Sequence, residues 1–412
     1  MPPLRLLYLG FAFPPGVAGR FPHLNTAGHP FECGFIGALS RELQVTSVGL
    51  LPPRIREPLP PPDDSPGLPH ALLLSPGRGG PAGAWRAWRK LRRWYEAQIR
   101  AGATFDVALA YNLTPAYNRF LRWLHARPRR PRLALLLADS STLGRPLPRL
   151  RRLRWRLKPM RTPDDEALAW FDAAIGLSRD TQRFFAPRGI PWLWMPGGVP
   201  PEAPPGETCP PGEGPVNFAY FGALAEHSGV RTLVEAFVRA DVPGTLRLCG
   251  RGRLSGWLRD FAARHPRVRF DGLLPRPEDC LSWAAASDVL VNPRPATWGN
   301  ENNFPSKVFN YALTGRLVLT TRLSGVETVL GEGAEYLDPE PLAPALVDAL
   351  RRLARTPRAE LCRRGGLIRD RVLRHYTWPR QAGRVAAFLR AVVTDESRAA
   401  NQESGTGAGR VA

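Results

Sequence analysis

The most constraining feature of this sequence is a regular alternation of short apolar runs and amphipathic stretches between residues 216 and 354. The apolar runs have the length and the aliphatic content of buried strands, and they lie at 216–221, 245–249, 268–271, 287–291, 316–321 and 334–337. The amphipathic stretches have helical spacing and lie at 229–240, 254–264, 277–285, 306–314 and about 341–354. This alternation predicts a doubly wound α/β fold with a parallel sheet.

A looser form of the same alternation runs through the first 195 residues. Apolar runs that we interpret as strands lie at 4–9, 45–51, 107–110, 133–137 and, as the last one of this half, 173–177. Helical stretches are expected at 31–43 and 84–100, whereas residues 52–83 are rich in Pro and Gly and predict a long loop. A chain of 412 residues is too long for one ordinary core, so each half is expected to form a domain.

The boundary between the halves is expected in the segment 196–215, which contains eight Pro and five Gly among its twenty residues. Neither a helix nor a central strand can form from such a composition. We therefore predict an N-terminal domain at 1–195 and a C-terminal domain at 216–378, joined by this linker. A strongly amphipathic final helix is expected at 379–393, and the small, polar residues 394–412 are expected to be disordered.

The charge is unusual, because 57 Lys and Arg residues give the chain a formal net charge of +21. Much of the excess lies between residues 85 and 161, where Trp85, Trp88 and Trp94 stand beside arginines. The electrostatic field of this positive charge attracts polyanions, anionic lipid or phosphorylated substrates. The tryptophans could stack on bases or lie at a lipid interface. A general compositional bias toward Arg explains the charge equally well, and this tryptophan spacing is more typical of a helix face packed on a core.

The five cysteines are widely spaced and form no CxxC pair, so the sequence predicts neither a metal site nor a disulfide framework. The N-terminal apolar run is short and interrupted by Pro and Gly, which favours a first strand over a secretory signal. No apolar run reaches 18 residues, so we expect no transmembrane helix. These features favour a reduced, cytoplasmic protein.

Two glycine-containing turns follow predicted strands of the second half. Gly222 comes after the run 216–221, and Ser228 or Gly229 then begins a helix whose N–H groups could hold an anion. The second turn is Gly250-Arg251-Gly252. A glycine permits both a tight turn and the close approach of a phosphate, so a purely structural role remains an alternative for both turns.

The most informative segment spans residues 292–312. A polar stretch that contains Glu301 leads into a helix with Ser306 as its expected cap and Lys307 in its first turn. A cation there opposes the helix dipole, which makes sense if an anion binds at that end. Amides suit hydroxyl-rich ligands and Lys307 suits a phosphate; the amides are Asn300, Asn302, Asn303 and Asn310. The alternative is a polar surface loop before an ordinary helix.

The residues of the second half occur in an order that resembles a known family. The segments FAYFGAL, SGVRTLVEAF, LRLCGRG, VRFDGLLP, LSWAAASDVLVNP, NFPSKVFNYALTGRLVLTT and HYTWPRQAGRVAAFL follow one another between residues 218 and 389. Together they resemble the C-terminal domain of GT4-like glycosyltransferases of the GT-B fold. The first half resembles that family only in its broad alternation of strands and helices.

The resemblance implies a GT-B architecture, with two Rossmann-like, doubly wound parallel-sheet domains facing a cleft. In such enzymes the C-terminal domain binds the nucleotide-sugar donor, the N-terminal domain binds the acceptor, and a final helix, here 379–393, crosses back to the first domain. Gly222 would approach the diphosphate, the turn at 250–252 would lie near the base, and residues 301–310 would contact the ribose, phosphates and sugar. Transfer with retention and without a metal or other cofactor is implied, because positive side chains stabilise the leaving diphosphate.

The sequence departs from the family pattern at several positions. Ala223 and Ser228 stand where the family has basic residues, and Asn302 and Asn310 stand where it has two glutamates, with Glu301 adjacent. An N-domain histidine of the family would fall at Ala138, next to a retained Asp139. The implied catalytic residues are Glu301, Lys307 and Asp139. The implied donor-binding residues are Gly222, Ser228, Arg231, Gly250, Arg251, Gly252, Arg294, Asn302, Asn303, Ser306 and Asn310.

Three functions are compatible with these residues. The favoured one is a divergent but active glycosyltransferase of polysaccharide or glycolipid assembly, which uses a nucleotide-sugar donor and a glycan, lipid-linked or small-molecule acceptor. A lipid-linked acceptor would bring it to the anionic inner face of the cell membrane as a peripheral protein. The second is a GT-B protein that binds sugar nucleotides or a partner without catalysis. The third is a basic membrane- or nucleic-acid-binding protein, with nucleic acid the less favoured partner.

Overall fold

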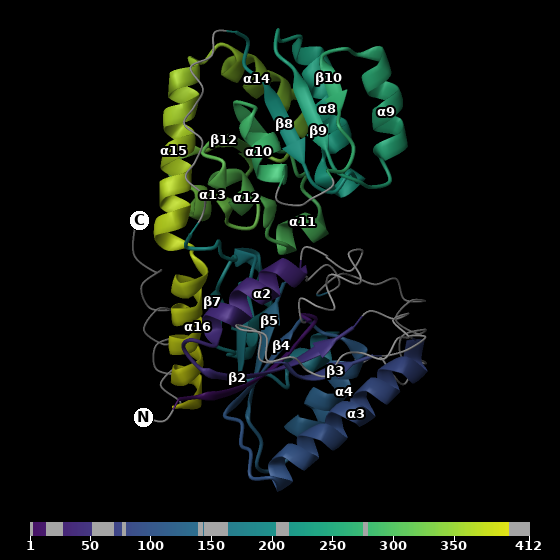
Figure 1. The fold of residues 1–412 in the computed structure, drawn as a ribbon, viewed down its shortest axis with the longest axis vertical. Coiled ribbons are helices and arrows are strands. Elements are labelled where there is room, and N and C mark those ends of the chain that lie inside the picture. Colours follow the sequence, from purple (N-terminus) through teal and green to yellow (C-terminus); the bar gives the residue numbers. More distant parts are fainter. Residues whose placement is uncertain are drawn as a thin grey trace. The chain divides into compact units, whose positions relative to one another are not determined.

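The computed structural model describes residues 3–13, 28–51, 70–75, 80–138, 143, 164–202, 214–274 and 279–394. The chain divides into two compact units, which are each described by themselves (Figure 1). Unit 1 comprises Met1–Gly198 together with Trp378–Ala412, and unit 2 comprises Val199–Thr377. Unit 1 is therefore built from both ends of the chain.

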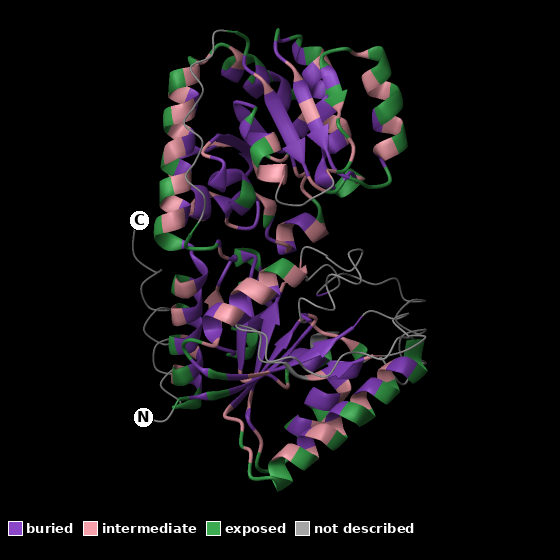
Figure 2. Cartoon of the chain, in the orientation of Figure 1, coloured by how far each residue is buried: buried purple, intermediate pink, exposed green. Residues whose placement is uncertain are grey.

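Unit 1 contains a seven-stranded parallel sheet in the order β3-β2-β1-β4-β5-β6-β7. Its strands are β1 Arg5–Gly10, β2 Gln44–Leu50, β3 His70–Leu74, β4 Val107–Tyr111, β5 Arg132–Leu137, β6 Ala173–Gly176 and β7 Trp192–Trp194. The central strands are buried along most of their length because helices cover the sheet, which explains their continuous apolar runs (Figure 2). The strand order reverses between β1 and β4.

The helices of unit 1 are α2 Gly28–Leu39, α3 Gly80–Arg100, α4 Pro115–His125, α6 Asp164–Leu168, α7 Gln182–Phe185 and α16 Trp378–Val393, with 3-10 turns at Arg179–Thr181 and Ala186–Arg188. α4 begins at a Thr114 cap, whose side chain accepts from the Tyr117 N–H. α16 packs on α2, and the rings of Phe31 and Trp378 lie 5.1 Å apart.

Unit 2 contains a six-stranded parallel sheet in the order β10-β9-β8-β11-β12-β13. Its strands are β8 Phe218–Phe221, β9 Leu246–Cys249, β10 Val268–Phe270, β11 Val289–Asn292, β12 Leu317–Thr321 and β13 Glu335–Leu337. Its helices are α8 Val230–Ala240, α9 Ser255–Arg264, α10 Asp279–Ala285, α11 Trp298–Asn302, α12 Lys307–Leu313, α13 Val326–Leu330, α14 Leu342–Ala354 and α15 Arg358–His375, with 3-10 turns at Glu226–Ser228 and Gly331–Gly333. The prediction of doubly wound parallel sheets is confirmed in both units.

The structure corrects several local predictions. The segment 52–83 is not one long loop, because it contains β3 and the first turn of α3. β6 is not the last strand of unit 1, since β7 follows it at the sheet edge. α15 was not predicted, and the polar stretch before Lys307 contains the short helix α11. Cys362 is disulfide-bonded, although the cysteine spacing predicted no disulfide.

Two further predictions concern the linker and the C-terminal tail. Residues 203–213 of the linker and residues 395–412 of the tail lie outside the described part of the chain. On the described side of the linker, Val199 pairs with Thr377 in an isolated parallel bridge, so the first and last residues of unit 2 are neighbours. None of the helices in the described ranges combines the length and apolarity needed to cross a bilayer.

Candidate functional site

The candidate site lies in unit 2 at the carboxyl ends of β8, β9 and β11. The strand order reverses between β8 and β11, and in open parallel sheets ligands bind outside the strand ends at such a reversal. The loops that follow these three strands carry most of the residues predicted from the sequence. Their backbones and side chains contact one another in ways that the sequence did not reveal.

The glycine turns after β8 and β9 pack against each other. A Cβ added to Gly250, which has a φ of +145°, would lie 1.9 Å from the Gly222 carbonyl oxygen. A Cβ on Gly252 would lie 2.1 Å from the Leu224 carbonyl oxygen. The Leu224 N–H donates to the Arg251 carbonyl at 3.0 Å, which joins the two turns. This close backbone packing by itself requires glycine at positions 250 and 252.

Gly222 has a different neighbour. Its φ is +140°, and an added Cβ would lie 2.8 Å from Lys307 Nζ and 3.5 Å from the Tyr220 hydroxyl. The missing side chain therefore leaves room for the ammonium group of Lys307 beside the first turn. The Gly222 N–H itself donates to the Cys249 carbonyl oxygen at 3.0 Å, so it is already hydrogen-bonded.

Lys307 begins α12 and reaches back over the end of β8. Its Nζ donates to the Tyr220 hydroxyl at 2.7 Å and lies 4.1 Å from the centroid of the same ring. Tyr220 in turn donates to the Ala223 carbonyl at 2.7 Å, which fixes the ring. Burial, with repulsion from Arg294 second, lowers the pKa of Lys307 to about 7. An anion bound beside this ammonium would reverse that effect.

Arg294 is a second half-buried cation in the site. Its Nη2 and Nε donate to Asn300 Oδ1 at 2.6 and 3.0 Å, and its Nη1 donates to the Asn303 carbonyl at 2.9 Å. Burial lowers the pKa of Arg294 to about 10. Among the described residues, no carboxylate forms an ion pair with Arg294 or with Lys307. Two cations that are held by neutral groups alone create a positive potential at the strand ends.

Asn300 connects the loops after β8 and β11. Its Nδ2 donates to the carbonyl oxygens of His227 and Pro295, both at 2.8 Å, while its Oδ1 receives Arg294. The pKa of His227 is lowered by burial and then by the charges of Arg294 and Lys307. The Asn300 side chain is therefore engaged within the protein, and it holds Arg294 in place instead of facing a ligand.

The other predicted residues of this segment differ in exposure. Asn302 is buried and its Nδ2 donates to the Trp298 carbonyl at 2.7 Å, whereas Glu301 and Asn303 are half-buried. Ser306 and Asn310 are exposed. Ser306 stands at the predicted N-cap position of α12, but its side chain makes no capping hydrogen bond.

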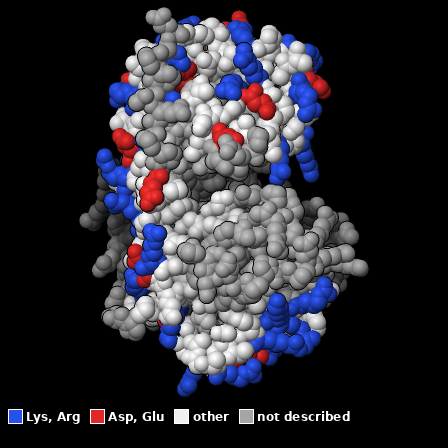
Figure 3. Space-filling model, in the orientation of Figure 1, with Lys and Arg blue, Asp and Glu red and all other residues white. Residues whose placement is uncertain are grey.

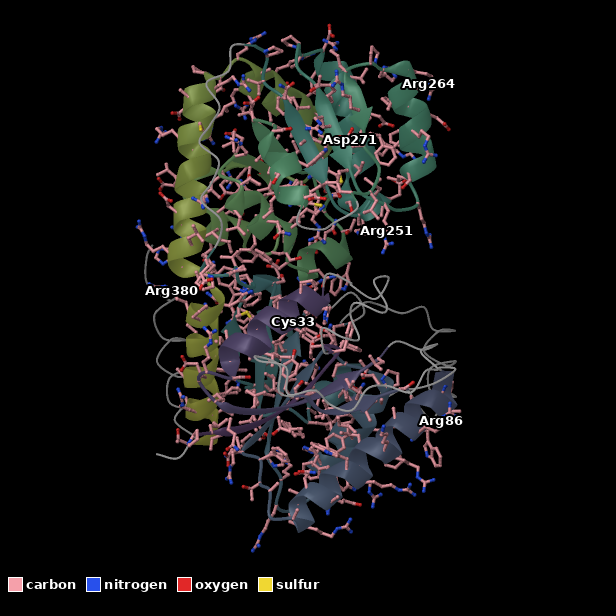
Figure 4. The ribbon with its side chains drawn as sticks, in the orientation of Figure 1. Cys33, Arg86, Arg251, Arg264, Asp271 and Arg380 are labelled. Carbon is pink, nitrogen blue, oxygen red and sulfur yellow. The ribbon has the colours of Figure 1, made fainter. Side chains whose placement is uncertain are left out.

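The remaining predicted residues lie around this centre or outside the described residues. Ser228 is buried, and its side chain lies beside the Tyr220 phenol, whose pKa it affects. The Arg231 guanidinium lies 4.2 Å from the Trp257 ring centroid and 3.2 Å from Glu226 Oε1. Arg251 is exposed and extends outward from its turn (Figure 4). Asp139 lies outside the described residues.

Sequence reasoning missed a buried ionisable group in unit 1, Glu32 of α2. Its carboxylate lies at the carboxyl end of β1, where it accepts from the Tyr8 hydroxyl and the Phe11 N–H, both at 2.9 Å. Burial raises the pKa of Glu32 to about 7. No motif surrounds Glu32, and nothing in its local sequence indicates this environment. Tyr220 and His227 of unit 2 were missed for the same reason.

Part of the second half of the chain matches a known protein family. Residues 215–356 match the family model described as glycosyl transferases group 1. No curated protein sequence matches the chain.

Several solved structures share the fold. The apo lipopolysaccharide outer core galactosyltransferase WaaB is 12% identical, with a TM-score of 0.64 over 94% of this chain and 100% of that one. Sucrose-phosphate synthase from Thermosynechococcus elongatus is 16% identical, with a TM-score of 0.64 over 95% and 100%. Anabaena HepE in complex with UDP is 13% identical, with a TM-score of 0.62 over 94% and 100%. The GT-B fold and the resemblance of the second half to this family are confirmed.

Proposed function

We propose that this chain, a glycosyltransferase of the GT-B type, binds a nucleoside-diphosphate sugar at the carboxyl edge of the unit 2 sheet and transfers the sugar to an acceptor that unit 1 binds. One observation carries the proposal. Lys307 and Arg294 are half-buried at the strand ends, with Lys307 beside Gly222, and among the described residues only neutral groups hydrogen-bond them. A diphosphate would supply the negative charge that these cations lack.

The two cations would act on the leaving group. When the bond between the anomeric carbon and the diphosphate oxygen breaks, the electron pair stays on that oxygen and its negative charge grows. Lys307 and Arg294 are held by Tyr220 and Asn300, so they need not reorganise as this charge develops. The protein thus supplies positive charge from its own side chains, which is why we propose a reaction that needs no metal. Retention of the anomeric configuration is proposed from the family resemblance alone.

The surrounding residues suggest how the rest of the donor is held. The exposed Asn310 and the half-buried Glu301 would hydrogen-bond the hydroxyls of the ribose and the transferred sugar. The exposed Arg251 would reach the nucleotide from the turn after β9. Asp139 of unit 1 remains a proposed acceptor-side residue. HepE in complex with UDP, and a trehalose-6-phosphate protein of E. coli bound with UDP-2-fluoro glucose, share this fold and support a nucleotide-sugar donor.

Calorimetric titration with UDP, GDP, ADP and TDP, followed by their sugars, tests the site. Lys307→Met should weaken binding roughly 10- to 100-fold, because a charge-assisted hydrogen bond to phosphate is lost. Its unliganded melting temperature should stay equal or rise, since a half-buried cation with no carboxylate partner among the described residues is removed. Lys90→Met, the same substitution on α3, should leave binding unchanged. Equal affinities of wild type and Lys307→Met would remove Lys307 from the site.

The pH dependence gives a second check. Without a ligand, the pKa of Lys307 is about 7, and a bound anion raises this pKa. Above pH 7 the free protein has therefore lost a proton that it must regain when the anion binds. The affinity of wild type for the nucleotide should therefore fall as the pH rises above about 7, by up to about tenfold per pH unit. Lys307→Met should lack this fall.

A separate assay distinguishes a transferase from a protein that only binds sugar nucleotides. It measures whether the protein releases the nucleoside diphosphate from the sugar donor.

A further inference from the structure

The long helix α3 of unit 1 exposes a row of cations. Its inner side buries Ala87, Leu91 and Tyr95 against the unit. Its outer side, which we call the α3 face, carries the exposed cations Arg86, Arg89, Lys90, Arg93 and Arg100. The helix contains one acidic residue, Glu96, whose Oε1 lies 2.9 Å from Arg92 Nε. The positive charge of the α3 face is therefore not balanced within the helix.

The packing of α3 on α4 adds to this charge. Arg122, Arg127 and Arg129, at and after the end of α4, are also exposed, and α4 contains no acidic residue. The guanidinium groups of Arg127 and Arg92 lie 4.2 and 5.2 Å from the centroid of the Trp123 ring. Figure 3 shows Lys and Arg side chains gathered on the surface where α3 runs, and Figure 4 shows Arg86 extending outward near one end of the helix.

Two large apolar side chains accompany the cations. Trp85 is 42% exposed and Ile99 is 43% exposed, near the two ends of α3. They are fourteen positions apart along the helix, which corresponds to roughly 21 Å. The apolar inner side of α3 is buried in the core of the unit. Trp85 and Ile99 are therefore the large apolar side chains of α3 that can contact an apolar environment outside the protein. An exposed tryptophan with arginines beside it is typical of a protein surface at a lipid interface.

We propose that the α3 face docks on an anionic phospholipid bilayer, with its cations on the headgroups and with Trp85 and Ile99 entering the interface. Attraction to an anionic leaflet grows with each basic residue close to the surface. A nucleic acid explains the surface less well. The Arg89 guanidinium lies 4.5 Å from the Trp85 ring centroid and covers a face on which a base would stack, and Ile99 has no part in binding a phosphate backbone. This proposal does not depend on the proposed donor site.

Sedimentation of the full-length protein with phosphatidylcholine vesicles, with and without phosphatidylglycerol, tests the proposal. Wild type should sediment with the anionic vesicles only, and added salt should weaken this binding because the attraction is screened. The triple variant Arg86→Gln, Arg89→Gln, Arg93→Gln should lower the partition coefficient roughly a hundredfold. Trp85→Ala should weaken the binding that remains at high salt. Thermal melting and donor binding of both variants should match wild type.

A matched control removes three exposed arginines of unit 2, with Arg259→Gln, Arg264→Gln and Arg269→Gln. This control should retain vesicle binding. If it loses as much binding as the α3 variant, net charge and not the α3 face drives the association, and the proposal is wrong. It is also wrong if wild type does not bind anionic vesicles. Binding of a fluorescent oligonucleotide that the α3 variant no longer binds would then assign this surface to nucleic acid.

Discussion

At the scale of single residues, the two units place ionisable groups of opposite sign at their strand ends, with Glu32 buried and Lys307 half-buried. Lys307 in unit 2 and Glu32 in unit 1 both have a pKa moved to about 7 by burial. Glu32 differs from Lys307 in its partners, because the backbone around Phe11 and the Tyr8 hydroxyl donate to its carboxylate. It therefore fixes the loop after β1, at the edge of the sheet where a ligand of unit 1 would bind.

Glu32→Gln should change how stability depends on pH. The pKa of Glu32 rises from 4.5 to about 7 on folding, so the folded state keeps a proton that the unfolded state has lost between these values. The unfolding free energy of wild type should therefore fall by about 3 kcal/mol as the pH rises through this window. Urea titrations should show that Glu32→Gln lacks this fall and that Glu235→Gln, at an exposed carboxyl, keeps it. Parallel curves for wild type and Glu32→Gln would contradict the assignment.

The sequence allowed only part of this chemistry to be predicted. Lys307 was identifiable because a cation in the first turn of a helix after a polar loop is unusual. Its partner Tyr220 is 87 positions away, and Asn300 meets His227 across 73 positions, so their contacts depend on strand pairing that no local pattern encodes. The glycines were recognised as turn residues, but Gly250 is required by the carbonyl of Gly222 and not by a ligand alone.

At the scale of the elements, α15 shows how a polar helix can be held in a fold. Only four of its residues are buried, and its arginines bind to other elements of unit 2 instead. Arg371 donates to the carbonyl oxygens of Thr328 and Val329, and Arg364 donates to Glu335 at 2.8 Å. The adjacent pair Gly365-Gly366 lies in the middle of this helix, where glycine disfavours helix formation.

The two glycines should respond oppositely to alanine. A Cβ on Gly365 would lie 2.1 Å from the Gly315 carbonyl oxygen, whereas a Cβ on Gly366 would meet nothing within 4 Å. Gly365→Ala should therefore destabilise unit 2 by about 1–3 kcal/mol through overpacking. Gly366→Ala should stabilise it by about 0.5–1 kcal/mol through helix propensity. Urea unfolding of both variants measures the difference, and equal effects would show that α15 does not lie this close to the loop at Gly315.

The elements that were predicted correctly share a physical origin. All six strands of unit 2 lie within two residues of their predicted bounds. β8, β11 and β12 are buried along their whole length and form mostly apolar runs. The three-residue edge strands β10 and β13 are only partly buried, and they were recognised from their place in the regular alternation. β7 is three residues long and half-buried, and β3 follows a Pro-rich segment, so neither gave such a signal. α15 was missed because its arginines and its glycine pair conceal the helical period.

At the scale of the whole molecule, unit 2 is inserted into unit 1. α16 follows unit 2 in the chain but belongs to unit 1, where it buries Trp378, Val385 and Leu389. A Cβ on Gly34 of α2 would lie 2.3 Å from the Trp378 indole nitrogen, and one on Gly198 would lie 2.6 Å from the same ring. Residues 1–198 by themselves therefore lack the part of the unit 1 core that α16 supplies.

The insertion predicts that the two units differ in autonomy. The fragment 199–377 contains a complete sheet, and its ends meet where the Val199 N–H donates to the Tyr376 carbonyl at 2.9 Å. It should unfold cooperatively by itself and keep nucleotide binding, because Lys307, Arg294 and Gly222 all lie within it. Circular dichroism with calorimetry measures both properties.

The fragment 1–198 should not fold stably by itself, because it leaves the surface that α16 covers exposed to water. Joining residue 198 to residue 378 through a short glycine linker should restore a cooperative transition, since Gly198 already contacts the Trp378 ring and the linker has little distance to span. Trp378→Ala in this joined chain should again destabilise it, by about 3–5 kcal/mol, because a large buried side chain is lost. If the fragment 1–198 alone melted at the same temperature as the joined chain, α16 would not contribute to the stability of unit 1, and this prediction would be wrong.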